Sequence, residues 1–300
     1  MTLGINAAFT IKRWPEPEVW LALVREHLQL DLVQFSLDQL DPRGVPSAIL
    51  PEAARIRREA ERLGVTIHSA QVGLAGYSFN LLLHPDPAIR EDGLRWCQAA
   101  VRLAAAVGAR GFGGPLGALS VRDARDPGRR DMLVKWMIEA IGGLSETARA
   151  EGLAFLLWEP TPLAREIPSS IDETRWFLSR LDAISAVPVT LCLDVGHACR
   201  PGATGDDADP YAWIRALGSR ASVIHLQQTD GRLDRHWPFT EQYAAEGIIS
   251  AQAVRAAVRD GRCEHVPLVL EIFHPFEAPD DQVLADLKAS VDYWRRALAA

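Results

Sequence analysis

The chain has 300 residues, of which 48% are hydrophobic and 24% charged, and its net charge at pH 7 is -7. This composition is that of an ordinary globular protein, and the length suffices for one large domain. The acidic balance argues against a general nucleic-acid-binding protein, and the absence of an apolar run of about 18 residues argues against a membrane span.

Short apolar runs alternate along the chain with longer segments of helical periodicity. In the first half, strands are predicted at 3–9, 32–37, 65–70 and 109–113, and helices at 17–29, 47–63, 87–107 and 127–150. In the second half, strands are predicted at 153–159, 189–193, 222–226 and 266–272, and helices at 170–181, 211–217, 250–259 and 280–298. The strand at 109–113 is short, and we expect the glycines that begin with Gly113 to break it.

Eight strand-then-helix units in one chain predict a parallel sheet with helical crossovers. At this length they favour a single (β/α)8 TIM barrel that occupies residues 1–300 as one domain. The alternative is an open doubly wound sheet. Its usual evidence, a GxGxxG turn after the first strand, is missing here.

The run from Val189 to Leu193 has the near-continuous apolar pattern of a strand buried on both faces, and Asp194, Gly196 and His197 follow it. A buried carboxylate without a partner is costly, and a metal ion is one partner that removes this cost. The other interpretation of Asp194 is a helix N-cap beside a surface histidine.

Three more of the predicted strands end, or nearly end, in a residue of a type that can bind metals. These residues are Glu159, His225 and Glu271. With Asp194 they come from the last four consecutive units, and the carboxyl ends of barrel strands share one rim where active sites lie. Three carboxylates would repel one another without a cation, and an oxygen-rich set with one nitrogen suits Mn²⁺, Mg²⁺ or Co²⁺. We therefore predict a site for one divalent metal ion, with Mn²⁺ as the first choice, whose ligands are Glu159, Asp194, His225 and Glu271.

Four segments of the chain resemble the xylose isomerase-like TIM-barrel superfamily, the sugar phosphate isomerase/epimerase group. The segments are 155–160, 193–197, 223–226 and 270–271. The resemblance covers nearly the whole chain and is most specific at the Asp-Val-Gly-His turn and the two strand-end glutamates. It implies that Glu159 and Glu271 are the acid/base pair as well as metal ligands, that His197 contacts the substrate, and that the protein forms a homo-oligomer.

The chemistry of such an enzyme agrees with these residue types. Epimerising a ketose requires removal of a proton from the carbon next to a carbonyl, and a metal that binds the carbonyl and the neighbouring hydroxyl stabilises the enediolate. Two carboxylates on opposite faces of that carbon allow removal from one side and return on the other. If one base serves both faces, the outcome is aldose–ketose isomerisation, and both outcomes stay open at this point.

Other polar residues in the predicted strand-end loops are candidates for substrate binding. His68 lies near the end of the third strand, Arg165 in the loop after the fifth, and Arg232 and His236 in the long loop after the seventh. An arginine in such a loop can bind an anionic substrate through its fork of donors. Each also has a plain interpretation, which is a buried histidine in a hydrogen bond or a solvated loop residue.

We predict an isomerase or epimerase of a small keto sugar or sugar phosphate. The loop from His225 to Phe239 resembles a subgroup associated with four-carbon polyol catabolism, which implies a tetrulose phosphate. The alternative is a metal-dependent decarboxylase or dehydratase of an oxo sugar acid. Two further hypotheses are disfavoured: a DNA-repair enzyme, because the chain has only 8 histidines and an acidic balance, and a binding module, because binding alone does not need two strand-end glutamates.

The N-terminal residues lack the basic and apolar regions of a signal peptide. The four cysteines form no CxxC pair and no disulfide framework. These features predict a cytoplasmic protein. The acidic charge and the lack of a long apolar run predict that its partner is a small molecule rather than a nucleic acid or a membrane.

Overall fold

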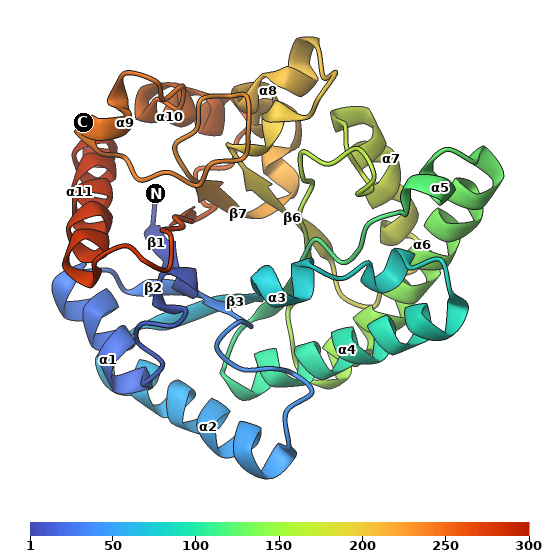
Figure 1. Cartoon of the computed structure of the whole chain (residues 1–300), viewed down its shortest axis with the longest axis horizontal. Helices are drawn as coiled ribbons and strands as arrows, with labels where there is room; N and C mark the ends of the chain where they lie inside the picture. Colours follow the sequence, from blue (N-terminus) through green and yellow to red (C-terminus); the bar gives the residue numbers. More distant parts are fainter. Residues whose placement is uncertain (300) are drawn as a thin grey trace.

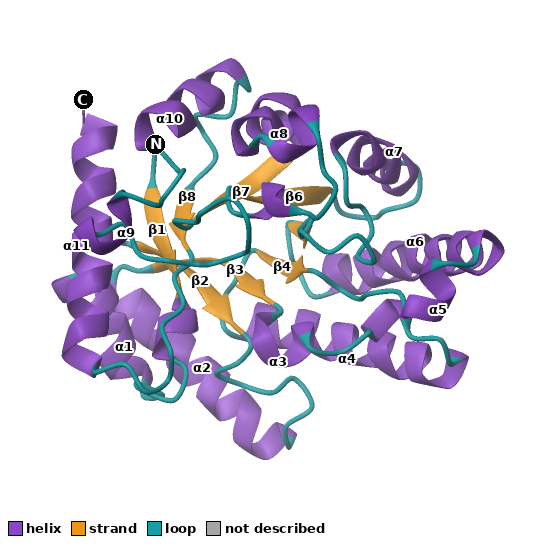
Figure 2. Cartoon of the chain, turned by 45° about the horizontal axis from the view of Figure 1, so that its top comes forward, coloured by secondary structure: helices purple, strands orange, loops and turns teal. Residues whose placement is uncertain are grey.

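Eight parallel strands form a closed barrel in chain order, which confirms the predicted (β/α)8 fold. The structure is a computed structural model and describes residues 1–299. The strands lie inside a ring of helices (Figure 2). They are β1 (Leu3–Asn6), β2 (Leu32–Ser36), β3 (Thr66–Gln71), β4 (Gly111–Gly114), β5 (Phe155–Trp158), β6 (Val189–Asp194), β7 (Ala221–Leu226) and β8 (Leu268–Leu270).

The long helices follow the strands and cover the outside of the barrel (Figure 1). They are α1 (Pro17–Ala22), α2 (Pro46–Leu63), α4 (Pro87–Ala106), α6 (Pro127–Ala150), α7 (Ile171–Asp182), α8 (Pro210–Leu217), α10 (Ala251–Asp260) and α11 (Asp280–Ala299). Each corresponds to a predicted helix. Within residues 1–299, no helix combines the length and apolar character needed to cross a membrane.

The predicted boundaries need three corrections. The first strand stops at Asn6 instead of residue 9, because the Asn6 side chain accepts a hydrogen bond from the amide of Ala8 and starts a 3-10 turn. The helix predicted at 17–29 is α-helical only to Ala22 and continues as a π-helical turn, Leu23–His27. Gly113 lies inside β4 rather than breaking it. The position requires glycine, because a Cβ there would lie 1.9 Å from the carbonyl oxygen of Leu157 on the neighbouring β5.

Three short helices in the strand-end loops were not predicted. They are α3 (Gly73–Tyr77), α5 (Val121–Ala124) and α9 (Glu241–Ala244). Asp38, which follows β2, caps α3 because its carboxylate accepts hydrogen bonds from the amides of Leu74 and Ala75, both at 2.8 Å. Gly73 makes this turn with a φ of 73°, and a side chain there would meet the Asp38 carboxylate.

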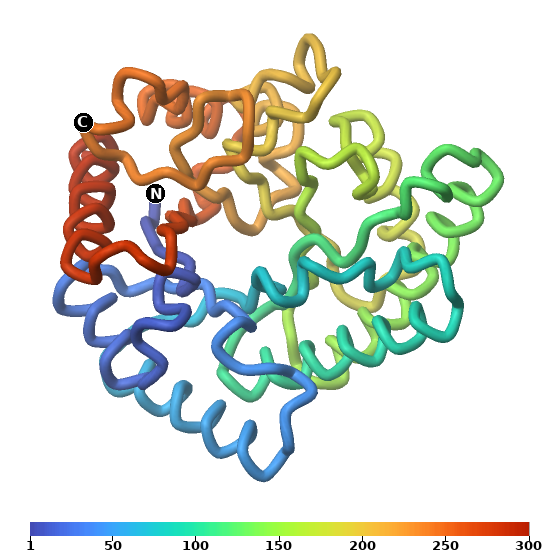
Figure 3. The backbone as a smooth tube through the Cα atoms, viewed as in Figure 1, coloured from blue at the N-terminus to red at the C-terminus, as the bar shows by residue number. Residues whose placement is uncertain are grey.

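Two apolar clusters hold the barrel together. The larger one lies between the strands and the helices, and a smaller one consists of Phe155, Leu157, Cys192, Val223 and Val269. Because side chains alternate along a strand, the second cluster fills the inside of the barrel. The chain runs once around this barrel, so its first and last units lie side by side, with β1 paired to β8 (Figure 3). The polar strand ends stand on this packed base.

Candidate active site

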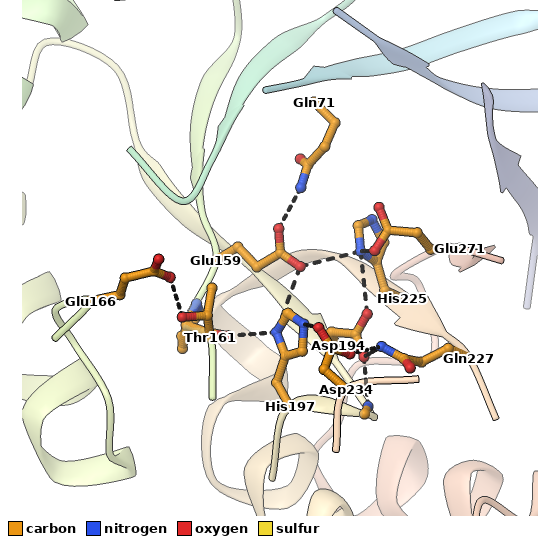
Figure 4. Close-up of polar contacts among 12 residues, drawn as sticks. Gln71, Glu159, Thr161, Glu166, Asp194, His197, His225, Gln227, Asp234 and Glu271 are labelled. Carbon is orange, nitrogen blue, oxygen red and sulfur yellow. Dashed lines mark hydrogen bonds and ion pairs between the residues drawn. The ribbon is translucent and has the colours of Figure 1, made fainter. Parts of the chain in front are cut away.

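The four predicted metal ligands converge at the carboxyl ends of their strands (Figure 4). Glu159 directly follows β5, Asp194 ends β6, His225 lies in β7, and Glu271 directly follows β8. One ligand atom from each lies within 4.8 Å of the others, and all four residues are buried. Consecutive positions around a closed barrel thus bring together residues that are up to 112 positions apart in the chain.

The distances around His225 define the centre of this group. Its Nδ1 lies 3.0 Å from Oε2 of Glu271, 3.4 Å from Oε1 of Glu159 and 3.7 Å from Oδ2 of Asp194. Nδ1 of His225 and Oδ2 of Asp194 are buried and have no hydrogen-bond partner within residues 1–299. Buried polar atoms are normally paired, so two unpaired atoms at one point fit ligands of a cation. The three oxygen donors and one nitrogen suit Mn²⁺, Mg²⁺ or Co²⁺.

A network of amide side chains orients His225. Its Nε2 lies 2.7 Å from Oε1 of Gln34, and this oxygen also accepts a hydrogen bond from Asn6 at 2.8 Å. The amide nitrogen of Gln34 donates to Ser69 at 3.1 Å. Because Oε1 of Gln34 can only accept, Nε2 of His225 carries a proton, and Nδ1 is the nitrogen left to bind a cation between the carboxylates. Such outer partners fix the tautomer of a histidine that binds a metal.

Replacing Gln34 with Leu is therefore expected to weaken metal binding by about 10- to 100-fold, because the outer partner that fixes the His225 tautomer is lost. Titration calorimetry with Mn²⁺ measures this change. Gln39→Leu is the matched control, since Gln39 follows the same strand but bonds to Thr10. Equal Mn²⁺ affinity in the two variants would show that Gln34 does not position the ligand.

Amide donors also hold the carboxylates. Asn6 donates to Oε1 of Glu271 at 2.8 Å, and Gln71 donates to Oε2 of Glu159. In both glutamates the other oxygen faces His225. Gln227 donates to Oδ1 of Asp194 at 2.9 Å. Each carboxylate is thus fixed by one oxygen and presents the other to the centre of the site.

His197 and His236 lie beside this centre and share Asp234. Nδ1 of His197 lies 2.9 Å from the carbonyl oxygen of Pro160, and its Nε2 lies 3.3 Å from Asp234. Nε2 of His236 lies 3.2 Å from Asp234. Burial alone would lower the pKa of both histidines, but the neighbouring aspartates outweigh it, so the pKa of His197 lies well above its ordinary value and that of His236 is about 9. With one ligand atom of Asp194, ring nitrogens of both histidines form a second group within 4.8 Å.

Glu166, next to Arg165 in the loop after β5, is a buried carboxyl group. It hydrogen-bonds to the hydroxyl of Thr161, a residue that lines the cavity. Burial raises the pKa of Glu166 to about 7, although the bond to Thr161 and the charge of His197 act in the opposite direction. Glu166 therefore changes charge near neutral pH.

This shift gives an expected pH dependence of stability. A carboxyl group whose pKa of about 7 in the folded chain exceeds its ordinary pKa of 4.5 favours folding most at low pH, and this contribution is lost as the pH rises from 4.5 to 7. The loss amounts to about 3 kcal/mol at most. In urea denaturation, Glu166→Gln should match the wild type near pH 5 and exceed its free energy of unfolding near pH 8. A difference between the two proteins that does not change with pH would contradict the shift.

A cavity of about 180 Å³ opens above the four ligands, and both His197 and His236 line it. Its other walls come from the ends of β1 and β3, from the loops after β1, β2 and β8, and from α3. They include Asn6, Ala8, Asp38, Gln71, Leu74, Tyr77 and Phe273. This volume suits a small molecule rather than a polymer, and its walls combine apolar surface with hydrogen-bonding groups.

Three other candidate residues lie outside this cavity. His68 lies inside the barrel against Phe155, with ring centroids 5.5 Å apart. Burial lowers the pKa of His68 to about 4, and the charge of Arg110 contributes to this shift. Arg165 donates to the carbonyl oxygen of Leu119 at 3.0 Å. Arg232 is exposed. None of the three lines the cavity, so in this structure their surroundings fit the plain interpretations given above.

Known proteins resemble this chain over nearly its whole length. The model of the xylose isomerase-like TIM barrel family matches residues 23–297. The chain is 28% identical over 296 residues to a D-erythrulose 1-phosphate 3-epimerase of Brucella abortus (strain 2308). The aligned region covers 98% of this chain and 95% of that protein.

Two solved structures illustrate the range of similarity. A protein of Rhodospirillum rubrum ATCC 11170, provisionally named a xylose isomerase, has a TM-score of 0.93 and 34% identity over 99% of both chains. A D-psicose 3-epimerase of Clostridium cellulolyticum H10 has a TM-score of 0.75 and 17% identity, again over 99% of both chains. At that level of identity the second likeness concerns the fold alone.

Proposed function

Because the chain belongs to the xylose isomerase-like TIM barrel family, we propose that it epimerises a small ketose phosphate at the carbon next to the carbonyl group. The relatives confirm the coarser prediction of a sugar isomerase or epimerase. The observation that carries the proposal is the pair of buried glutamates, Glu159 and Glu271, on one rim with Asp194 and His225. The similarity to a D-erythrulose 1-phosphate 3-epimerase supports a tetrulose phosphate as the substrate.

We propose that Glu159, Asp194, His225 and Glu271 hold one divalent cation, with Mn²⁺ as the first choice. When bound, such a cation acts as a Lewis acid toward substrate oxygens and offsets the negative charge that develops when a carbon acid loses its proton. The unpaired, buried Nδ1 of His225 and Oδ2 of Asp194 support this assignment.

The two glutamates are proposed as the acid/base pair. One glutamate, as the carboxylate, removes the proton from the carbon next to the carbonyl, and the other, as the carboxylic acid, gives its own proton to the opposite face. Their amide partners, Gln71 for Glu159 and Asn6 for Glu271, keep each carboxylate from rotating. Proton transfer on opposite faces of a bound sugar requires two carboxyl groups that are fixed in this way. Two positioned carboxylates favour inversion at this carbon over aldose–ketose isomerisation.

His197 and His236 are proposed to contact the substrate, although each of their ring nitrogens already has a partner in this structure. Both line the cavity, and both lie beside Asp234, whose charge favours their protonated forms. An imidazolium donor is stronger than a neutral one. Arg165, Arg232 and His68 are not part of this proposal, because none of them lines the cavity.

The proposal is tested by incubating the protein with erythrulose 1-phosphate of one configuration in the presence of Mn²⁺. Chiral chromatography follows the reaction over time. The expected result is an approach to an equal mixture of the two epimers at carbon 3. Release of carbon dioxide from an oxo sugar acid, or a new absorbance from an unsaturated product, would instead support the decarboxylase or dehydratase alternative. The absence of any inversion with a panel of C4 to C6 ketoses and their phosphates would refute the proposal.

A further inference from the structure

Within residues 1–299, no lysine or arginine lines the cavity above the four predicted ligands, and its two histidines, His197 and His236, are already paired with Asp234. The carboxylates in its lining are Asp38, Glu159, Asp234 and Glu271. A phosphate monoester carries about 1.5 to 2 negative charges at pH 7, and it is normally held by positive donors. The phosphate of a ketose phosphate therefore needs a neighbouring site that supplies them.

A second cavity of about 190 Å³ adjoins the first. It lies between the loop after β1 and the loop after β8, which are side by side because β1 pairs with β8 (Figure 3). The two cavities share Ala8, Leu74 and Phe273 as lining residues. A molecule that spans this shared wall has one end near the two glutamates and the other end in the second cavity.

Arg13 is the charged residue of the second cavity. Only 6% of its side chain is exposed, and Nη2 donates to three backbone carbonyls, of Pro275 at 2.7 Å, Ala278 at 3.2 Å and Phe276 at 3.3 Å. Its Nε makes no hydrogen bond within residues 1–299, although Oδ1 of the mostly exposed Asp280 lies 3.1 Å away. The guanidinium is thus fixed by one nitrogen and has donor capacity left.

Lys12 adds to this charge, whereas His274 does so only in its protonated form, because burial lowers its pKa. The side chain of His274 is 8% exposed, its Nε2 lies 3.2 Å from Asp286, and its buried Nδ1 has no partner within residues 1–299. Nζ of the exposed Lys12 lies 5.0 Å from the ring centroid of Phe276, which lines the same cavity. A protonated His274 can keep its bond to Asp286 and donate from Nδ1 to an anion.

We infer that the second cavity is the subsite for the phosphate group of a ketose phosphate, with Arg13 and His274 as donors and Lys12 at its rim. The inference rests on the proposed function and adds where the phosphate is recognised. Charge supports this placement, since four carboxylates line the first cavity and, within residues 1–299, none lines the second.

The first test compares erythrulose 1-phosphate with unphosphorylated erythrulose in three variants. His274→Gln keeps an amide that can bond to Asp286 but lacks Nδ1, Lys12→Gln removes an exposed charge, and Arg13→Lys keeps charge without the guanidinium fork. Each is expected to lower kcat/KM for the phosphorylated sugar by about tenfold or more, mainly through KM, and to leave the free sugar unaffected. Arg295→Gln is the matched control, because that guanidinium also donates to backbone carbonyls but lines neither cavity. Equal losses with both sugars would overturn the inference.

The second test does not depend on catalysis. Binding of inorganic phosphate to the full chain is followed by titration calorimetry in the wild type and in the same variants. Weaker binding in His274→Gln and Arg13→Lys than in Arg295→Gln supports the subsite even if no sugar is epimerised, in which case only the proposed function fails. Phosphate binding that is absent, or equal in all variants, would overturn the subsite even if epimerisation is observed.

Discussion

Treatment with a chelator is expected to abolish epimerisation, and Mn²⁺ is expected to restore it. Without a cation, three carboxylates and His225 face one another within 4.8 Å in a buried site. Binding of an ion to such a site raises the free energy of unfolding, by about 2.7 kcal/mol when the free ion concentration is 100 times Kd. The melting temperature of the chelated protein should therefore rise by several degrees on addition of Mn²⁺, and metal analysis should find one ion per chain.

Asp194→Asn is the informative variant for this prediction. It keeps the size of the side chain and removes one of the negative charges that face the centre of the site. The variant should bind Mn²⁺ far more weakly and lose the thermal shift. Asp123→Asn is a matched control, because Asp123 is also fully buried but pairs with Arg122 and Arg129 away from the cavity. An unchanged melting temperature with Mn²⁺ in the wild type would contradict the metal assignment.

Replacing either Glu159 or Glu271 with Gln is expected to lower kcat for epimerisation by a factor of about 10² to 10⁴, the usual contribution of a positioned acid or base. Each glutamine keeps an oxygen for the cation but cannot accept the proton from carbon. Loss of activity with a retained Mn²⁺ thermal shift would separate the acid/base role from metal binding.

Glu59→Gln is the matched control for these variants. Glu59 is a buried glutamate on α2 that pairs with Arg62, far from the cavity in the fold. Its replacement should leave kcat unchanged. If Glu271→Gln keeps full activity while it holds the metal, Glu271 is not part of the acid/base pair.

The eight strands and the four polar residues at the strand ends were predictable because both follow local patterns. A run of apolar residues that ends in Glu159 or Asp194 is visible without knowledge of the fold, and the barrel rule then places the ends on one rim. The amide residues that orient them were missed. Asn6 and Gln34 lie in β1 and β2, and only closure of the barrel brings them next to Glu271 and His225.

Depth inside the barrel and loop conformation limited the remaining predictions. Gln71 at the end of β3 reaches the site through its bond to Glu159. His68 lies three residues earlier on the same strand, where its side chain packs against Phe155 inside the barrel. Arg232 and Asp234 are two positions apart in one loop, and only Asp234 lines the cavity. Polar residue type alone does not distinguish such neighbours, because a loop has no fixed side-chain period.

The most direct test of two-base epimerisation is solvent exchange at carbon 3 of erythrulose 1-phosphate in D₂O. If one glutamate removes the proton and the other returns a different one, each inverted molecule should carry one solvent deuteron at carbon 3, detected by proton NMR and mass spectrometry. Either single glutamate variant should then lose inversion. Inversion without deuterium at carbon 3 would contradict proton transfer through two carboxylates, and with it the proposed mechanism.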